Sequence, residues 1–177
     1  VQTRGQGRTW RRVLVGQKLL TEESVRTGRD GEADVRFGEG VEVRLSPRSE
    51  FSVRELDEAG LARIRLEEGR VAASVRDDDE HVLKVETRGS DAVATSRGGD
   101  FGVVADGRGR LTVATTTGSV KLIAKGRSVD VETGTMATFT RDADGPSAPR
   151  PVPRSLLLKL GDVPQRRTNQ ATTTIEG

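Results

Sequence analysis

The stretch LTVATTTGSVKLIAKGRSVDV, residues 111–131, decides the fold of this chain. Apolar and polar residues alternate in Leu111-Thr112-Val113, in Val120-Lys121-Leu122 and in Val129-Asp130-Val131, with glycine between the runs. Side chains of a β-strand point alternately to its two faces, so each run predicts a short strand with one buried and one solvated face. Glycine between such runs is typical of turns.

The same alternation extends along the rest of the chain, with glycine at nearly every break. We expect strands around residues 10–15, 24–26, 33–37, 41–45, 51–53, 71–75, 83–85, 92–95, 101–104, 111–115, 119–124, 128–132 and 136–140. Trp10 and the four phenylalanines fall at expected core positions. Short strands and regular turns predict an all-β, solenoid-like stack or β-roll. Because the intervals drift, a β-sandwich remains the alternative.

Residues 54–68 are compatible with two structures. Leu56, Ala59, Ala62 and Leu66 lie near helical spacing. A helix would contain Gly60, at a cost of about 1 kcal/mol relative to alanine. We therefore favour two strands joined by a turn at residues 57–60.

Composition restricts the core and the chemistry. With 33% hydrophobic and 3% aromatic residues, the core must be thin and built from aliphatic side chains. The 29 basic and 27 acidic residues nearly balance, which gives no strong overall field. Absence of cysteine excludes disulfides, zinc–thiolate sites and thiol nucleophiles. No run approaches the roughly 18 apolar residues of a membrane span.

Composition also predicts the domain organisation. Residues 1–9 are expected to be a flexible lead-in and residues 10–141 the all-β domain. Prolines cluster in residues 142–154, which we interpret as a linker. Residues 155–177 contain a short apolar segment and an apparent first strand at Thr172–Ile175, as if a further domain, Ig-like in one interpretation, began there. The chain starts at Val1, which suggests part of a longer protein.

Candidate chemical sites are few. His81 follows the acidic run Asp77–Glu80, whose carboxylates could bind a hard cation, but the run lacks the glycine-punctuated spacing of a calcium loop. His81 has no serine in a nucleophile-elbow setting. Asp100 is expected to cap its turn, and Gly98-Gly99 is too short for a phosphate loop. We assign no catalytic, cofactor-binding or metal-binding residue.

Several segments together resemble the FecR-domain family of bacterial envelope proteins. The similar segments are Val15-Gly16-Gln17, Val25-Arg26-Thr27-Gly28, Gly31 to Phe37, Gly40, Val43 to Pro47, Ser49, Leu66 to Val71, Val85-Glu86-Thr87, Arg97-Gly98-Gly99-Asp100-Phe101 and Gly118 to Leu122. The resemblance spans about residues 12–140. It departs from the family at Arg88, where proline is usual, and at Gly99, where threonine is usual. It marks nine residues as structural: Gly16, Thr27, Gly28, Gly40, Gly69, Arg97, Gly98, Phe101 and Gly118.

The resemblance implies a periplasmic or other extracytoplasmic module that binds or senses protein partners, or a neighbouring domain, and has no enzymatic activity or cofactor. Family members that regulate sigma factors make transmembrane signalling a possible role. The alternative is a carbohydrate-active or cell-wall-polymer-binding β-helix, with an arginine-rich face attracting anionic polymer. Nucleic-acid binding is not expected, because the chain has no tyrosine and its other aromatic residues are expected in the core.

Overall fold

The fold is known from a computed structural model, which describes residues 1–5, 7–78, 80–153 and 172–175. These residues form strands, turns and irregular segments, with no helix among them, so none that could cross a membrane. The strands are β1 (Gln2–Arg4), β2 (Arg11–Arg12), β3 (Ser24–Arg26), β4 (Ala33–Phe37), β5 (Val41–Leu45), β6 (Glu50–Leu56), β7 (Leu61–Val75), β8 (Val82–Thr87), β9 (Val93–Ala105), β10 (Leu111–Ala124), β11 (Arg127–Glu132), β12 (Thr135–Phe139), β13 (Arg150–Pro151) and β14 (Thr172–Ile175). The all-β prediction is confirmed.

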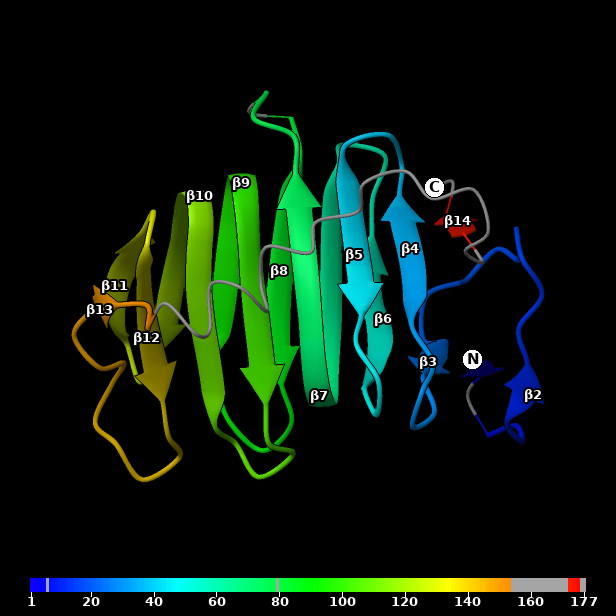
Figure 1. Ribbon diagram of the computed structural model, residues 1–177, viewed down its shortest axis with the longest axis horizontal. Coiled ribbons are helices and arrows are strands. Elements are labelled where there is room, and N and C mark those ends of the chain that lie inside the picture. Colours follow the sequence, from blue (N-terminus) through cyan, green and yellow to red (C-terminus); the bar gives the residue numbers. More distant parts are fainter. Residues whose placement is uncertain (6, 79, 154–171, 176–177) are drawn as a thin grey trace.

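All of these strands belong to one open, mixed sheet, whose main path runs β13-β12-β10-β9-β8-β7-β6-β3-β1-β2. Most neighbours are antiparallel, whereas β7–β8 and β4–β14 are parallel. The strands stand side by side along the long axis, with β1–β3 at one end and β11–β13 at the other (Figure 1). A regular solenoid repeat does not follow from this pairing, and that finer part of the fold stays a prediction.

Three long strands, β7, β9 and β10, join two halves of the sheet, of which one contains β6 and β8 and the other contains β5. The first part of β7 pairs with β6 and β8 in one half, and its second part, from Gly69 on, pairs with β5 and β9 in the other. Likewise β9 and β10 pair with each other along most of their length, both before and after an irregular register between Thr115 and Val120 of β10. The halves overlap in Figure 1, with β5 in front of β6.

The glycines inside these long strands correct the sequence analysis. We expected chain breaks at Gly69, Gly99 and Gly118, but β7, β9 and β10 continue through them. Each of the three has a positive φ, of 97°, 95° and 76° respectively, which only glycine adopts readily. They therefore bend the strands instead of ending them. The turn predicted at residues 57–60 is confirmed, since β6 ends at Leu56 and β7 begins at Leu61.

The main core is a large cluster of mainly aliphatic side chains, and Ala114, Met136 and Val152 form a small second cluster. Phe37, Phe51, Phe101 and Phe139 are each at most 5% exposed, as expected. Trp10 is not a core residue. It is half-buried, and its ring lies 4.4 Å from the guanidinium carbon of Arg4 and 4.2 Å from that of Arg26.

The N-terminal expectations were wrong in two respects. Thr3, in the supposed flexible lead-in, is fully buried within β1, and its hydroxyl donates to the Ser24 carbonyl at 2.9 Å. The strand expected at residues 10–15 is limited to Arg11–Arg12, because a turn with Gly16 at φ 77° redirects the chain and leaves Val15 67% exposed.

At the other terminus, the expected linker contains β13, an edge strand that tolerates Pro151. The strand expected at Thr172–Ile175 is present as β14 and pairs in parallel with β4. The apolar segment 155–163 lies outside the described residues, and the proposed domain limits stay predictions.

Candidate binding site

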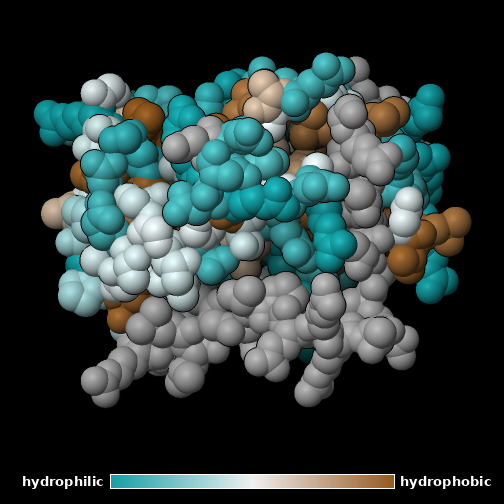
Figure 2. Space-filling model, turned by 90° about the horizontal axis from the view of Figure 1, so that it is seen from above, coloured by the Kyte–Doolittle hydropathy of each residue, from teal (hydrophilic) through white to brown (hydrophobic). Residues whose placement is uncertain are grey.

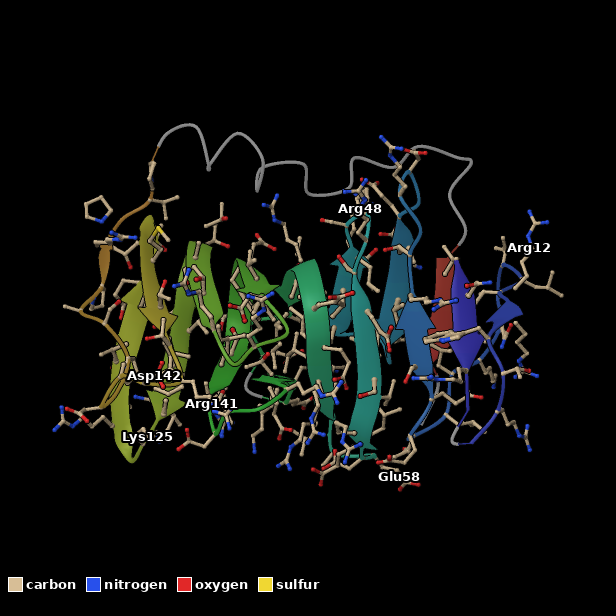
Figure 3. All side chains as sticks on the ribbon, turned by 90° about the horizontal axis from the view of Figure 1, so that it is seen from below. Arg12, Arg48, Glu58, Lys125, Arg141 and Asp142 are labelled. Atoms are coloured by element: carbon tan, nitrogen blue, oxygen red, sulfur yellow. The ribbon has the colours of Figure 1, made fainter. Side chains whose placement is uncertain are left out.

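A small pocket opens where turns from both halves of the sheet meet. It has a volume of about 250 Å³ and is lined by Phe37 and Gly38 after β4, by residues 56–58 and 60–62 around the β6–β7 turn, and by His81 before β8. Its lining includes the apolar residues Phe37, Leu56 and Leu61 together with the acidic residues Asp57 and Glu58. Figure 3 shows Glu58 at the tip of its turn, extending away from the sheet. The volume is below the range of about 300–1,000 Å³ for small-molecule sites, and it fits one side chain of a partner.

His81 is fixed in the wall of this pocket. Its Nδ1 lies 2.9 Å from Oδ1 and 3.0 Å from Oδ2 of Asp78, and its side chain is 15% exposed. The hydrogen bond with His81 lowers the pKa of Asp78, and the backbone N–H groups of Glu80 and His81 act in the same direction. Since this carboxylate is already hydrogen-bonded, the pair positions the loop rather than presenting free ligands.

His81 also explains one of the motif glycines. A Cβ added to Gly40 would lie 2.2–2.4 Å from three atoms of the His81 ring. Gly40 is buried and does not have a positive φ, so the ring is the reason that no side chain fits there. Among the described residues, which leave out Asp79, no group of three or more His, Cys, Asp or Glu side chains could hold a metal ion.

The outer edge of β4 runs towards this pocket. Residues 172–175 pair with it in parallel, with Thr172 opposite Asp34 and Ile175 opposite Phe37. On the other side of β4, Asp34 accepts two hydrogen bonds from Arg44 of β5, at 2.6 and 3.0 Å. Both side chains are mostly buried, and the hydrogen bond with Asp34 raises the pKa of Arg44. This buried pair joins β4 firmly to β5, so the edge that receives β14 is rigid.

Thr27 and Gly69 form a corner that joins β3, β6 and β7. The Thr27 hydroxyl donates to the Ser46 carbonyl at 2.7 Å and accepts from the Ser49 backbone N–H at 2.9 Å. The Ser49 hydroxyl in turn donates to the Arg70 carbonyl at 3.1 Å and accepts from the Arg70 N–H at 2.9 Å. A Cβ at Gly69 would lie 2.4 Å from Ser49 Oγ, so the bend packs tightly against Ser49.

Gly98, Gly118 and Phe101 lie together at the bend shared by β9 and β10. A Cβ at Gly118 would lie 2.7 Å from the Gly98 carbonyl oxygen, and one at Gly98 would lie 2.8 Å from Asp77 Oδ1. Phe101 is 3% exposed within the core. Asp100 does not cap a turn as expected: it lies within β9, and its carboxylate accepts a hydrogen bond at 2.9 Å from the hydroxyl of Thr117, its partner on β10.

The remaining motif residues lie apart from these corners. Gly16, Gly28 and Arg97 are exposed, and an added Cβ at Gly16 or Gly28 would meet no atom within 4 Å. The structure therefore separates motif residues that are needed for close packing from those located on the surface. It does not gather the nine into one site.

A second depression was not expected from the sequence. It has a volume of about 540 Å³ and is lined by Arg4, Ser24, Glu50, Arg65, Glu67, Glu68, Arg88 and Gly107. Burial raises the pKa of Glu50, against the opposing effect of Arg4, whose guanidinium lies 3.6 Å away. Glu67 accepts a hydrogen bond from the Ser52 hydroxyl at 3.2 Å. Glu50 is therefore ion-paired with Arg4 and Glu67 is hydrogen-bonded to Ser52. The charged residues Arg65 and Glu67, at alternate positions of β7, are a sequence signal that could have indicated this groove.

The fold resembles solved structures of a bacterial regulator. Two crystal structures of a "putative anti-sigma factor" from Parabacteroides distasonis ATCC 8503 each match with a TM-score of 0.61 and 16% identity. Each match covers 72% of this chain but 59% of the neighbour, so this chain spans less than two thirds of that protein. At this low identity the likeness concerns the fold alone.

The sequence itself identifies the family. None of the proteins with curated functions matches the chain. The FecR protein family profile matches residues 23–121, more than half of the chain. That match covers the Thr27–Ser49–Gly69 corner, the His81 pocket and the β9–β10 bend. The chain belongs to the FecR family.

Proposed function

We propose that this chain is a non-enzymatic regulatory module of an extracytoplasmic signalling protein, which binds a protein partner as an added strand on the edge of β4. The observation that carries the proposal is the parallel pairing of residues 172–175 with Asp34–Phe37. An unpaired strand edge offers N–H and C=O groups to any extended segment, and β4 receives one that is remote in sequence.

The pocket beside the edge adds selectivity to this mode of binding. In strand addition, main-chain hydrogen bonds supply affinity and pockets for alternate side chains supply specificity. The pocket begins at Phe37 and Gly38, where β4 ends, and has room for one side chain. A partner strand that ran past Phe37 could place a side chain there, and Asp57 and Glu58 would favour a neutral or basic one.

Family membership and the solved neighbours support the regulatory part of the proposal. The solved neighbours carry the description of an anti-sigma factor, and the chain belongs to the FecR family, and both are consistent with a role in signalling. A module of this kind needs a rigid surface that recognises another protein, not a reactive centre. The partner strand would compete with residues 172–175 for the same edge.

Hydrogen exchange tests the edge directly. In Thr173→Pro, proline removes a backbone N–H from the centre of β14, so those amides of residues 34–37 that face β14 are expected to exchange faster than in the unsubstituted chain, while those that face β5 stay protected. Gln170→Pro, before the paired residues, is the control and should leave these amides protected. Equal protection in all three chains would show that β14 does not cover β4.

Transcript profiling in the source bacterium tests the regulatory role. Deletion of the gene is expected to change a defined set of promoters, and the unsubstituted gene should restore them. The gene with Thr173→Pro, which frees the edge of β4 for a partner, should restore transcripts from these promoters to a different level than the gene with Gln170→Pro does. An unchanged transcript profile after deletion would reject the signalling role, whereas an altered profile with identical complementation by both variants would reject only the β4 mechanism.

A further inference from the structure

Large hydrophobic side chains are exposed mainly at one end of the molecule. Leu14 is 73% exposed, Val15 67% and Leu20 66%, whereas the only other large apolar residue of this kind in the described part of the chain, Ile123, is 37% exposed. The three lie between β2 and β3, at the end of the sheet where the described chain begins (Figure 1). Figure 2 shows hydrophobic groups protruding at this end from a mostly hydrophilic surface.

Two hydrogen-bonded turns hold these side chains outward. The Gln17 N–H donates to the Leu14 carbonyl at 3.2 Å, and the Glu23 N–H donates to the Leu20 carbonyl at 3.0 Å. The side chain of Leu19, between the turns, is 2% exposed and anchors the loop in the core. The exposure of Leu14, Val15 and Leu20 is therefore part of the folded structure and not the result of a loose tail.

Positive charge surrounds the same loop. Residues 1–20 contain Arg4, Arg8, Arg11, Arg12 and Lys18 and no acidic residue, although Glu22 and Glu23 follow in the same loop, and Arg4 and Arg11 form ion pairs with Glu50 and Glu23 at 3.6 and 3.7 Å. The side chains of Arg8 and Arg12 are exposed, and Figure 3 shows Arg12 extending outward at this end. We call Leu14, Val15, Leu20, Arg8 and Arg12 the N-terminal surface.

Elsewhere on the sheet, arginines face acids across neighbouring strands. Arg36 pairs with Glu42, and Arg63 with both Glu55 and Glu86, at distances of 3.3–3.8 Å. These pairs neutralise one another locally. The N-terminal surface thus combines an excess of one sign of charge with protruding apolar side chains, and the paired faces of the sheet lack this combination.

We infer that the N-terminal surface docks on an anionic lipid bilayer. Apolar side chains at the tips of turns can enter the interface between headgroups and acyl chains, while arginines beside them contact lipid phosphates. An anionic polysaccharide would satisfy the arginines but would leave Leu14, Val15 and Leu20 in water. The apolar tips therefore favour a lipid surface over a purely charged polymer.

Vesicle binding of the 177-residue chain tests this inference. The probes are vesicles of phosphatidylglycerol and phosphatidylethanolamine, compared with vesicles of phosphatidylcholine alone. Trp10 is the only tryptophan, so its fluorescence reports on this end of the molecule in titrations, alongside co-sedimentation. We expect binding to the anionic vesicles that weakens as salt is added, and much weaker binding to phosphatidylcholine.

Paired substitutions separate the two contributions. Arg8→Gln with Arg12→Gln should weaken binding about fivefold for each arginine. Leu14→Ser with Leu20→Ser should weaken it on the order of tenfold or more while charge is unchanged. The matched controls are Lys125→Gln with Arg141→Gln, whose side chains lie towards the other end in Figure 3, and Ile123→Ser. All of these controls should bind as the unsubstituted chain does.

Three results would overturn the inference. One is absence of binding to anionic vesicles at low salt. A second is vesicle binding that is unchanged in the variant with Leu14→Ser and Leu20→Ser, which would indicate that charge attraction alone holds the chain on the vesicles. The third is that the unsubstituted chain binds no vesicles but self-associates in analytical ultracentrifugation, and that Leu14→Ser with Leu20→Ser makes it monomeric. That result would show that the surface contacts a second copy of the chain.

Discussion

The contact between Gly40 and His81 gives the sharpest test of why a motif glycine is present. In Gly40→Ala the new methyl group would lie 2.2–2.4 Å from the His81 ring, so the ring must move. Movement would break its hydrogen bond with Asp78 and disturb the wall of the pocket. Overpacking of this kind costs about 1–3 kcal/mol. For a chain of this size, that lowers the melting temperature by about 2–4 °C per kcal/mol.

A double-mutant cycle assigns the cost to His81. The single substitution His81→Ala loses one hydrogen bond and part of the ring's burial, about 1–2 kcal/mol. In the double variant Gly40→Ala/His81→Ala, the methyl group enters the space that the ring has left. The double variant should therefore be about as stable as His81→Ala alone, with a coupling energy of about 1–3 kcal/mol. Urea unfolding of the four proteins measures each free energy.

Gly28 supplies the matched control. It also belongs to the predicted motif and lacks a positive φ, but a Cβ there would meet no atom within 4 Å. Gly28→Ala should change stability by no more than about 0.5 kcal/mol. Strictly additive effects of Gly40→Ala and His81→Ala, or an equal loss in Gly28→Ala, would refute the steric explanation.

Three further predictions concern the core, the corner and the groove. Phe101→Ala should cost about 3–5 kcal/mol in urea unfolding, and an unchanged midpoint would contradict its place in the core. Gly69→Ala should cost at least about 2 kcal/mol, and Ser49→Ala should not rescue it, because the added Cβ would also lie 2.6 Å from Ser49 Cα. The pKa of Glu50 is raised above its unfolded value of about 4.3, so protonation of Glu50 stabilises the fold fully below that value, and this gain is lost as pH rises through the folded pKa. Glu50→Gln should therefore melt higher relative to the unsubstituted chain at pH 7 than at pH 4, and a pH-independent difference would contradict this.

Local patterns in the sequence predicted most of the strands. Alternation placed β4, β5 and β8 closely, because apolar residues that face the core alternate with polar or charged residues in each of them. The FecR resemblance also identified glycines with a steric function, such as Gly40 and Gly118. These signals lie within a few residues of the feature they describe.

The features that sequence reasoning missed depend on distant contacts. Gly69 was expected to end a strand, but its bend is set by Ser49, twenty residues earlier in the chain. Trp10 was expected at a core position, yet its ring lies against the guanidinium groups of Arg4 and Arg26. The pocket at His81 likewise requires the β4 end and the β6–β7 turn to meet. A pattern of hydrophobicity does not contain such information.

The bent strands have a mechanical consequence. Strands lie across the long axis, with the N-terminal strands and β13 at its opposite ends (Figure 1). Tension applied between Val1 and Val152 would act on the ladder hydrogen bonds one after another, which favours peeling of strands from either end. Because β7, β9 and β10 each belong to both halves, peeling would have to stop there until both halves opened together. The molecule should therefore yield softly at its ends and resist at its centre.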